Sequence, residues 1–128
     1  MSANPGLRIP TSASVAMTER EFQNAVIKLA RVYGFRVMHT RPAMMRSGRW
    51  STPLQGDPGW PDLVLCGRGR ILFRELKVGR NKLEPDQKAW RDAIRAAGCD
   101  WRLWTLADWP EGVQTDLAHR VNWNEDMS

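Results

Sequence analysis

The sequence predicts a single α/β domain in which a mixed central β-sheet is flanked by helices. Three observations support this fold class. The length of 128 residues suits one compact domain. Segments with apolar residues at helical spacing occur along the chain, and short strand-like apolar runs alternate with them. The expected order is helix, strand, long loop, two strands, helix, strand and helix, without internal repeats.

The first helix is expected over residues 18–33. Thr18 suits the N-cap, and Glu19 and Glu21 fall in the first turn, where acidic side chains complement the helix dipole. The apolar residues recur at helical spacing: Phe22, Val26, Leu29 and Tyr33. Gly34 ends the helix, and residues 35–40 are expected to form a short strand.

Two strands joined by a tight turn are expected after a long loop. The loop, residues 41–60, is rich in proline and glycine and has no periodicity, which is typical of functional or disordered loops. Residues 62–66 and 71–77 then flank a Gly-Arg-Gly-Arg turn, and this pattern indicates a β-hairpin. Apolar residues occupy alternate and intervening positions, so we expect a sheet that is covered on both faces.

The second half of the chain predicts a helix, a strand and a last short helix. Pro85 suits the first position of a helix that ends at Gly98. Its apolar stripe comprises Trp90, Ala93, Ile94 and Ala97. Residues 101–106 alternate as a strand, and 107–120 are expected to form the last helix. We therefore expect a flexible N-terminal segment over 1–16, a folded domain over 17–120 and a polar tail over 121–128.

The composition favours a cytoplasmic protein that binds a polyanion. No apolar run approaches the ~20 residues that span a bilayer, and the first residues lack the pattern of a secretion signal. Cys66 and Cys99 lie outside any Cys/His cluster and are expected to be reduced and buried. The net charge is +5, which is typical of proteins that bind DNA or RNA.

The hairpin brings three charged side chains together. If Arg68 and Gly69 are the turn residues, Asp62 faces Glu75 with a Cβ separation of ~5 Å. Lys77 projects from the same face because it lies two residues beyond Glu75. Two adjacent carboxylates require a shared proton or a cation between them. The alternative is a solvated strand face preceded by an ordinary turn aspartate.

A divalent cation at this point would suit phosphodiester hydrolysis. Carboxylate oxygens favour Mg²⁺ or Mn²⁺, and such an ion polarises a phosphoryl oxygen and lowers the pKa of a bound water. Lys77 would orient that water or offset the charge that grows on the phosphate.

Four motifs together resemble the signature of VRR-NUC domain nucleases, which belong to the PD-(D/E)xK restriction-endonuclease-like superfamily. In chain order they are Glu19 with Gln23, Gly59-Trp60-Pro61-Asp62, Glu75-Leu76-Lys77, and Leu83-Glu84-Pro85-Asp86-Gln87. The resemblance covers roughly residues 18–118. One departure is Glu84, which stands where a Ser or Thr helix cap is usual.

The resemblance implies a role for each matching residue. Asp62 and Glu75 would bind the metal together with the backbone carbonyl of Leu76, and Lys77 would be the catalytic lysine. Glu19 would approach the metal directly or through water, and Gln87 would order the site from the second helix. Without the resemblance, Glu19 and Gln87 are equally explained as residues that satisfy helix N-termini.

The resemblance also implies partners. Stand-alone members, many of them from viruses and bacteria, are dimeric, structure-selective DNA nucleases similar to Holliday-junction resolvases. We therefore expect a homodimer that acts on duplex or branched DNA with Mg²⁺ or Mn²⁺ and needs no nucleotide cofactor. A phage origin would place it in the cytoplasm of a bacterial host.

Further basic and aromatic residues are candidates for DNA contact. In the long loop these are Arg41, Arg46, Arg49 and Trp50, and beyond Lys77 they are Arg80 and Lys82. Arg68 and Arg70 are expected to face solvent, and His39 to be structural or to assist near the metal. Two rival functions remain open: a non-catalytic DNA-binding module with the same fold, and a nuclease for RNA or single strands.

Overall fold

The computed structural model describes residues 16–40, 43–44, 50–51 and 56–123, and the predicted order of elements is confirmed there. The helices are α1 (Glu19–Val32), α2 (Pro85–Ala96), the 3-10 turn η2 (Leu106–Asp108) and α3 (Glu111–Ala118). The strands are β1 (Arg36–His39), β2 (Ala43–Met44), β3 (Trp50–Ser51), β4 (Leu63–Gly67), β5 (Arg70–Lys77) and β6 (Asp100–Thr105).

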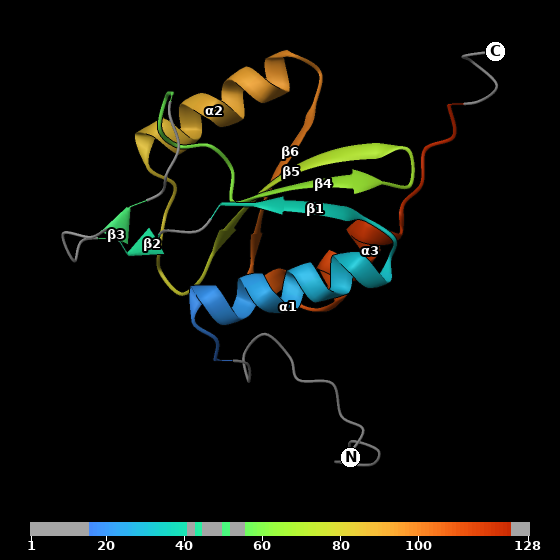
Figure 1. Ribbon diagram of the computed structural model, residues 1–128, viewed down its shortest axis with the longest axis horizontal. Coiled ribbons are helices and arrows are strands. Elements are labelled where there is room, and N and C mark those ends of the chain that lie inside the picture. Colours follow the sequence, from blue (N-terminus) through green and yellow to red (C-terminus); the bar gives the residue numbers. More distant parts are fainter. Residues whose placement is uncertain (1–15, 41–42, 45–49, 52–55, 124–128) are drawn as a thin grey trace.

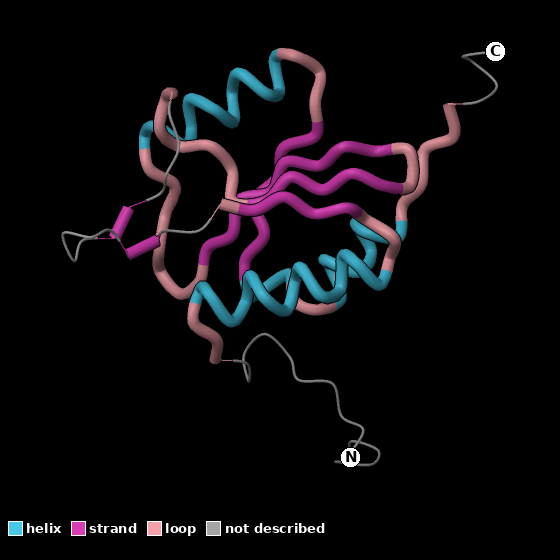
Figure 2. Tube along the Cα trace, in the orientation of Figure 1, coloured by secondary structure: helices cyan, strands magenta, loops and turns pink. Residues whose placement is uncertain are grey.

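The central sheet is mixed and has the strand order β1-β4-β5-β6. β4 pairs antiparallel with both β1 and β5, whereas β6 joins β5 in parallel. The parallel pairing requires a crossover connection, which α2 supplies. In Figure 1, α1 and α3 lie on one side of the sheet and α2 on the other, and Figure 2 shows the same layers. The expected α/β fold with a mixed, helix-flanked sheet is thus confirmed.

The core lies between the sheet and the pair α1 and α3. Its buried side chains come from the apolar stripe of α1, from one face of β4 and β5, and from α3; they include Phe22, Val26, Leu63, Leu65, Leu72, Leu76, Val113 and Leu117. None of the helices in the described part of the chain is long and apolar enough to cross a membrane.

The opposite face of the sheet is only partly covered, so the expectation of two covered faces was wrong. Met38 and Ile71 are 67% and 46% exposed, and Cys66 is also exposed. These residues point away from α1, because their neighbours Val37, Leu65 and Leu72 face it. α2 packs on β6 and leaves β1 and β4 open to solvent on this side (Figure 1). The expected burial of Cys66 was wrong for the same reason.

The turn between β4 and β5 sets the register that the sequence predicted. Arg68 and Gly69 have φ angles of 53° and 74°, which is typical of the two-residue turn that matches the twist of a hairpin. Gly67 pairs with Arg70, and the ladder continues to Leu63 opposite Arg74. The next position therefore places Asp62 opposite Glu75.

The same turn anchors the segment after α3. Arg68 donates hydrogen bonds to the carbonyl of Ala118, and the Val121 amide donates to the carbonyl of Arg68 at 2.9 Å. Trp123 Nε1 donates to the carbonyl of Gly69. The expectation that Arg68 simply faces solvent was wrong. The predicted flexible segment 1–16, except for Ala16, and the predicted tail after Trp123 lie outside the described residues.

Candidate active site

Asp62, Glu75 and Lys77 meet where β4 begins and β5 ends. Asp62 immediately precedes β4, and its Oδ2 accepts a hydrogen bond of 2.9 Å from the backbone amide of Leu76. This bond ties the carboxylate of Asp62 to the strand that carries Glu75. Lys77 is half-buried and projects from the same face of β5 as Glu75.

Glu75 carries a buried carboxyl group, and one of its two oxygens has no hydrogen-bond partner. Its side chain is almost fully removed from solvent, with a residue exposure of 2%. Oε2 accepts a hydrogen bond of 3.0 Å from Gln87 Nε2, whereas Oε1 is buried without a hydrogen-bond partner. Burial and the neighbouring Asp62 carboxylate raise the pKa of Glu75 to about 9, against the opposing effect of the Lys77 ammonium group. Without a cation, the Asp62–Glu75 pair therefore holds a proton at neutral pH.

Gln87 is oriented by its own helix. Its Oε1 accepts a hydrogen bond of 2.8 Å from the backbone amide of Glu84, the residue before α2. This bond fixes which end of the amide faces the site, so Nε2 must point to Glu75. Gln87 thus satisfies a backbone amide at the start of α2, where Glu84 stands in place of the usual Ser or Thr cap. The same side chain also reaches the carboxyl group of Glu75.

Glu19 lies in the first turn of α1, whose N-cap is Thr18. Burial raises the pKa of Glu19, the Asp62 carboxylate raises it further, and Lys77 opposes both effects. Glu19 is therefore close enough to Asp62 and Lys77 to interact with their charges. Within the described residues, however, no three His, Cys, Asp or Glu side chains approach closely enough to form a ready cage for a metal ion.

The residues fit a hard divalent cation that is held by few protein ligands. Two facing carboxylates and a buried carboxyl oxygen without a partner are the donors that Mg²⁺ or Mn²⁺ prefers. Mg²⁺ commonly binds through one or two carboxylates and takes its other ligands from water and substrate phosphate. The absence of a complete cage among the described residues is consistent with such a site.

Of the basic and aromatic residues predicted to contact DNA, only some lie in the part of the chain that the structure describes. Arg80 and Lys82 are exposed in the segment that follows β5. Arg41, Arg46 and Arg49 lie outside the described residues, and of Trp50 only the backbone is described, in β3. The short β2–β3 ladder lies within the predicted loop; two residues a side are too few to leave a periodic pattern.

His39 lies at the end of β1 opposite Leu63. Its Nδ1 is buried without a hydrogen-bond partner, and the amide of the next residue, Thr40, donates to the carbonyl of Asp62. His39 is thus close to the site in the sheet, but it points to the face opposite Glu75.

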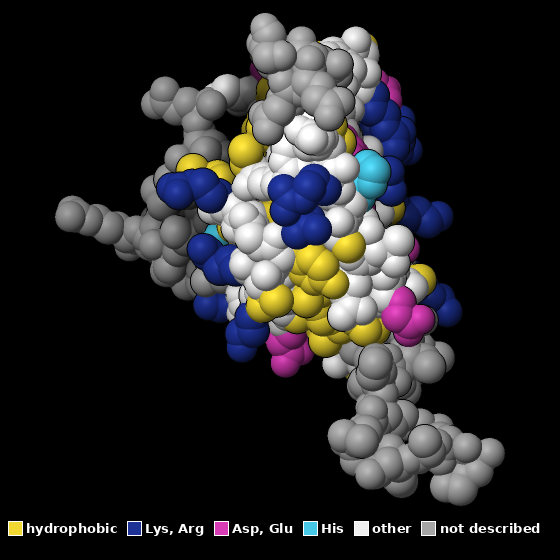
Figure 3. Space-filling model, turned by 90° about the vertical axis from the view of Figure 1, so that its right-hand side faces the viewer, with side chains coloured by type: hydrophobic (Ala, Val, Ile, Leu, Met, Phe, Trp, Pro, Cys, Tyr) yellow, Lys and Arg dark blue, Asp and Glu magenta, His cyan; other side chains and the backbone are white. Residues whose placement is uncertain are grey.

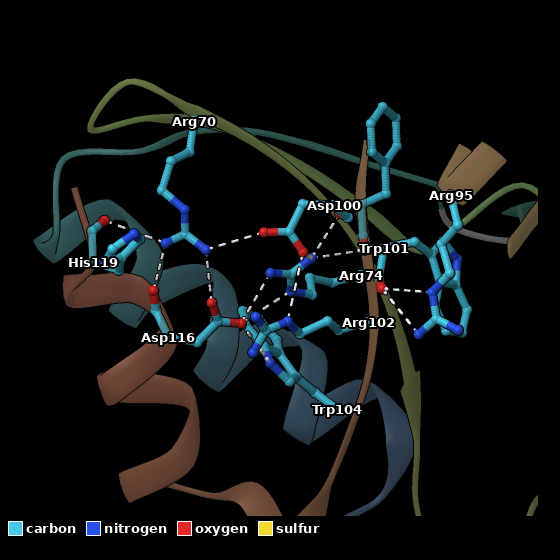
Figure 4. Close-up of polar contacts among 10 residues, drawn as sticks. Arg70, Arg74, Arg95, Asp100, Trp101, Arg102, Trp104, Asp116 and His119 are labelled. Carbon is cyan, nitrogen blue, oxygen red and sulfur yellow. Dashed lines mark hydrogen bonds and ion pairs between the residues drawn. The ribbon is translucent and has the colours of Figure 1, made fainter. Parts of the chain in front are cut away.

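A core ion cluster beside the site was not predicted from the sequence. It consists of Arg70, Arg74, Asp100 and Asp116, which point toward one another in Figure 4. The side chain of Arg70 is only 7% exposed, so its expected solvent-facing position was wrong. A signal was present: Arg74 interrupts an apolar strand at a position whose alternation points into the core.

The metal-free protein is expected to lose stability as the pH rises from 4.5 toward 9, the range over which the pKa of Glu75 is raised. In this range the unfolded chain has lost the proton that the folded site keeps, so the free energy of unfolding falls with pH. The expected slope is roughly 1 kcal/mol per pH unit. Urea denaturation at several pH values in the presence of EDTA measures it.

The matched control for this prediction is Glu75→Gln, which has no proton to lose. Its free energy of unfolding should depend much less on pH than that of the wild type. Parallel pH profiles for the two proteins would contradict the assignment of the proton to this site.

Comparison with known proteins supports the same fold. A solved structure described as a VRR_NUC domain superimposes on this chain with a TM-score of 0.54 and 22% sequence identity. The match covers 83% of this chain and 100% of that chain. No family model and no curated protein matches the sequence. The chain therefore has the fold of a VRR_NUC domain, as its motifs indicated.

Proposed function

We propose that this chain, folded as a VRR_NUC domain, is a Mg²⁺- or Mn²⁺-dependent endonuclease that hydrolyses DNA phosphodiester bonds. The observation that carries the proposal is the meeting of Asp62 and Glu75, with the buried Glu75 Oε1 left without a partner, beside Lys77. The fold supports a nuclease domain, because it is that of the solved VRR_NUC structure.

Each residue has a distinct role in the proposed reaction. Asp62 and Glu75 would hold the cation together with the carbonyl of Leu76, and Glu19 would contribute from α1 through water. A divalent cation at such a site polarises a phosphoryl oxygen and lowers the pKa of a water molecule. Lys77 offsets the charge that develops on the phosphate, and Gln87 keeps Glu75 oriented.

We further propose that the substrate is branched DNA. The net charge of +5 favours a polyanion, and the exposed Arg80 and Lys82 follow directly from the strand that carries Lys77. Arg41, Arg46, Arg49 and Trp50 would extend this contact surface. We also propose a cytoplasmic location, in a bacterial host if a phage encodes the protein.

A substrate panel tests the function. The purified protein is incubated with a four-way junction, linear duplex, single-stranded DNA and RNA, each with Mg²⁺, Mn²⁺ or EDTA. We expect the junction to be cut fastest with either metal and nothing to be cut in EDTA. Retention of DNA without cleavage would instead indicate a non-catalytic DNA-binding module. Preferential cleavage of RNA or single strands would indicate a nuclease for those substrates.

We also propose that two copies associate through the outer face of α1. A largely apolar groove there is lined by Asn24, Ala25, Lys28, Leu29, Val32 and Trp109. Val32 is 76% exposed, and Figure 3 shows hydrophobic side chains gathered on the side of the molecule that carries the C-terminal end of α1. Such a patch is typical of an interaction surface.

The charges along this face suit self-association. Glu21, Ala25, Lys28 and Val32 follow one stripe of α1. If two α1 helices pack antiparallel about a twofold axis near Ala25, Glu21 of each copy meets Lys28 of the other. Two nuclease sites in one dimer would allow paired cuts across a junction.

Ala25→Arg is expected to convert a dimer into a monomer. Near the twofold axis, the two introduced arginines would repel and clash with each other. Light scattering coupled to size-exclusion chromatography measures the mass. Ala96→Arg, at an exposed alanine at the end of α2, far from this groove, is the control and should leave the mass unchanged. A wild-type protein that is monomeric at micromolar concentration would contradict this proposal.

A further inference from the structure

The segment that leads to Asp62 lies against the first turn of α2. Gly59 has a φ of +97°, and a Cβ at this position would lie 2.4 Å from the backbone carbon of Asp86 and 2.8 Å from the backbone nitrogen of Gln87. Only glycine permits both this conformation and this approach. The backbone of the segment is therefore in direct contact with the helical turn that carries Gln87.

The indole ring of Trp60 lies between β5 and α2. It makes edge-to-face contacts with Phe73 of β5 at a centroid distance of 5.7 Å and with Trp90 of α2 at 4.8 Å. Trp90 Nε1 donates a hydrogen bond of 3.2 Å to the carbonyl of Asp57, which holds the helix to the start of the same segment. Two perpendicular aromatic contacts define the position of the ring well.

These contacts flank the hydrogen bond between Gln87 and Glu75. Phe73 lies two residues before Glu75 and on the same face of β5, whereas Trp90 lies three residues after Gln87 and on the same side of α2. Trp60 thus separates strand and helix next to the place where Gln87 Nε2 reaches Glu75 Oε2 at 3.0 Å. A hydrogen bond tolerates only a few tenths of an ångström of change in this spacing.

We infer that Trp60 is a positioning residue of the active site, a spacer that sets the distance between α2 and β5 and thereby the orientation of Glu75 toward the cation. The inference rests on the proposed function, since the cation is the one proposed there. Trp60 is also joined to Asp62 in the chain through Pro61, which is fully buried. Outer partners of metal ligands commonly affect affinity about 10- to 100-fold.

Calorimetric titration of the full chain with Mn²⁺ tests the inference. Trp60→Ala is expected to weaken Mn²⁺ binding about 10- to 100-fold, and Trp60→Phe, which keeps an aromatic edge in the gap, is expected to weaken it less. Cleavage by Trp60→Ala should recover at high Mn²⁺, because the reacting groups are intact. Trp123→Ala removes an exposed tryptophan at the far end of the hairpin and is the control, with unchanged affinity.

A second readout needs no metal. In the metal-free protein, the side-chain amide resonances of Gln87 report its bond to Glu75, and they should shift in both Trp60 variants but not in Trp123→Ala. If Trp60 only stabilises the fold, its variants will melt at lower temperature while the Mn²⁺ affinity and these resonances stay unchanged, and the inference is then overturned. If the wild type binds no Mn²⁺, the proposed function itself fails. The two failures are therefore distinguishable, and Trp60→Phe keeps the test decisive should Trp60→Ala not fold.

Discussion

Lys77→Ala is expected to abolish DNA cleavage while leaving DNA binding largely intact. Lys77 is half-buried beside the two carboxylates, and its charge opposes the rise that burial and Asp62 cause in the pKa of Glu75 and Glu19. At this position it can offset the negative charge that grows on the phosphate in the transition state. The loss of one such preorganised group lowers the rate by about 100- to 1,000-fold. Single-turnover cleavage of a four-way junction measures the rate, and gel retardation measures the binding.

The control for this prediction is an exposed lysine. Lys88→Ala changes the residue next to Gln87 on the solvent side of α2 and should retain most of the activity. Lys77→Ala also removes the cation that opposes protonation of Glu75, so part of its defect should respond to higher pH. Cleavage by Lys77→Ala at the wild-type rate would contradict the role given to this lysine.

Arg74→Ala is expected to destabilise the fold strongly. The Arg74 side chain is 0% exposed and binds Asp116 Oδ2 through Nε and Nη2, at 3.1 and 3.0 Å. It also donates to the Asp100 carbonyl at 2.8 Å and lies over the Trp104 ring. Its removal leaves the buried Asp116 with Arg70 and Trp104 as partners, and breaking a buried ion pair in this way costs about 3–5 kcal/mol. This is a large part of the total stability of a small domain, about 5–15 kcal/mol.

Chemical denaturation gives the free energy of unfolding for this test. The double variant Arg74→Met, Asp116→Leu removes both charges and should be less destabilised than the sum of the single variants, because no buried charge is left unpaired. Additive losses would show that the two side chains do not act as a pair. Glu75 follows Arg74 in β5, so even a folded single variant is expected to bind metal less well.

Local patterns were sufficient to predict the main helices, the strands of the central sheet and the hairpin. Helix spacing in residues 18–33 and the Arg68-Gly69 turn depend on near neighbours alone, and the turn type also determines the register. This is why the position of Asp62 opposite Glu75 could be predicted from the sequence alone. The covering of the second sheet face could not be predicted from the sequence. The exposure of Met38 and Cys66 depends on how far α2 extends over strands that are distant in the sequence.

The site was predicted as a set of acids and a lysine but not as a packed structure. The pattern of Gly59 and Trp60 marked a motif, yet their contacts with α2 arise only when residues about thirty positions apart meet. The partners of Arg70 and Arg74 likewise come from β6 and α3. Such long-range contacts leave no periodic signal in the chain.

Anomalous diffraction from crystals grown with Mn²⁺ would locate the ion in the protein without reference to activity. We expect one strong peak bonded to carboxylate oxygens of both Asp62 and Glu75, with Lys77 beside it. A peak elsewhere on the protein, or none at saturating Mn²⁺, would contradict the claim that these side chains form the catalytic centre of a nuclease.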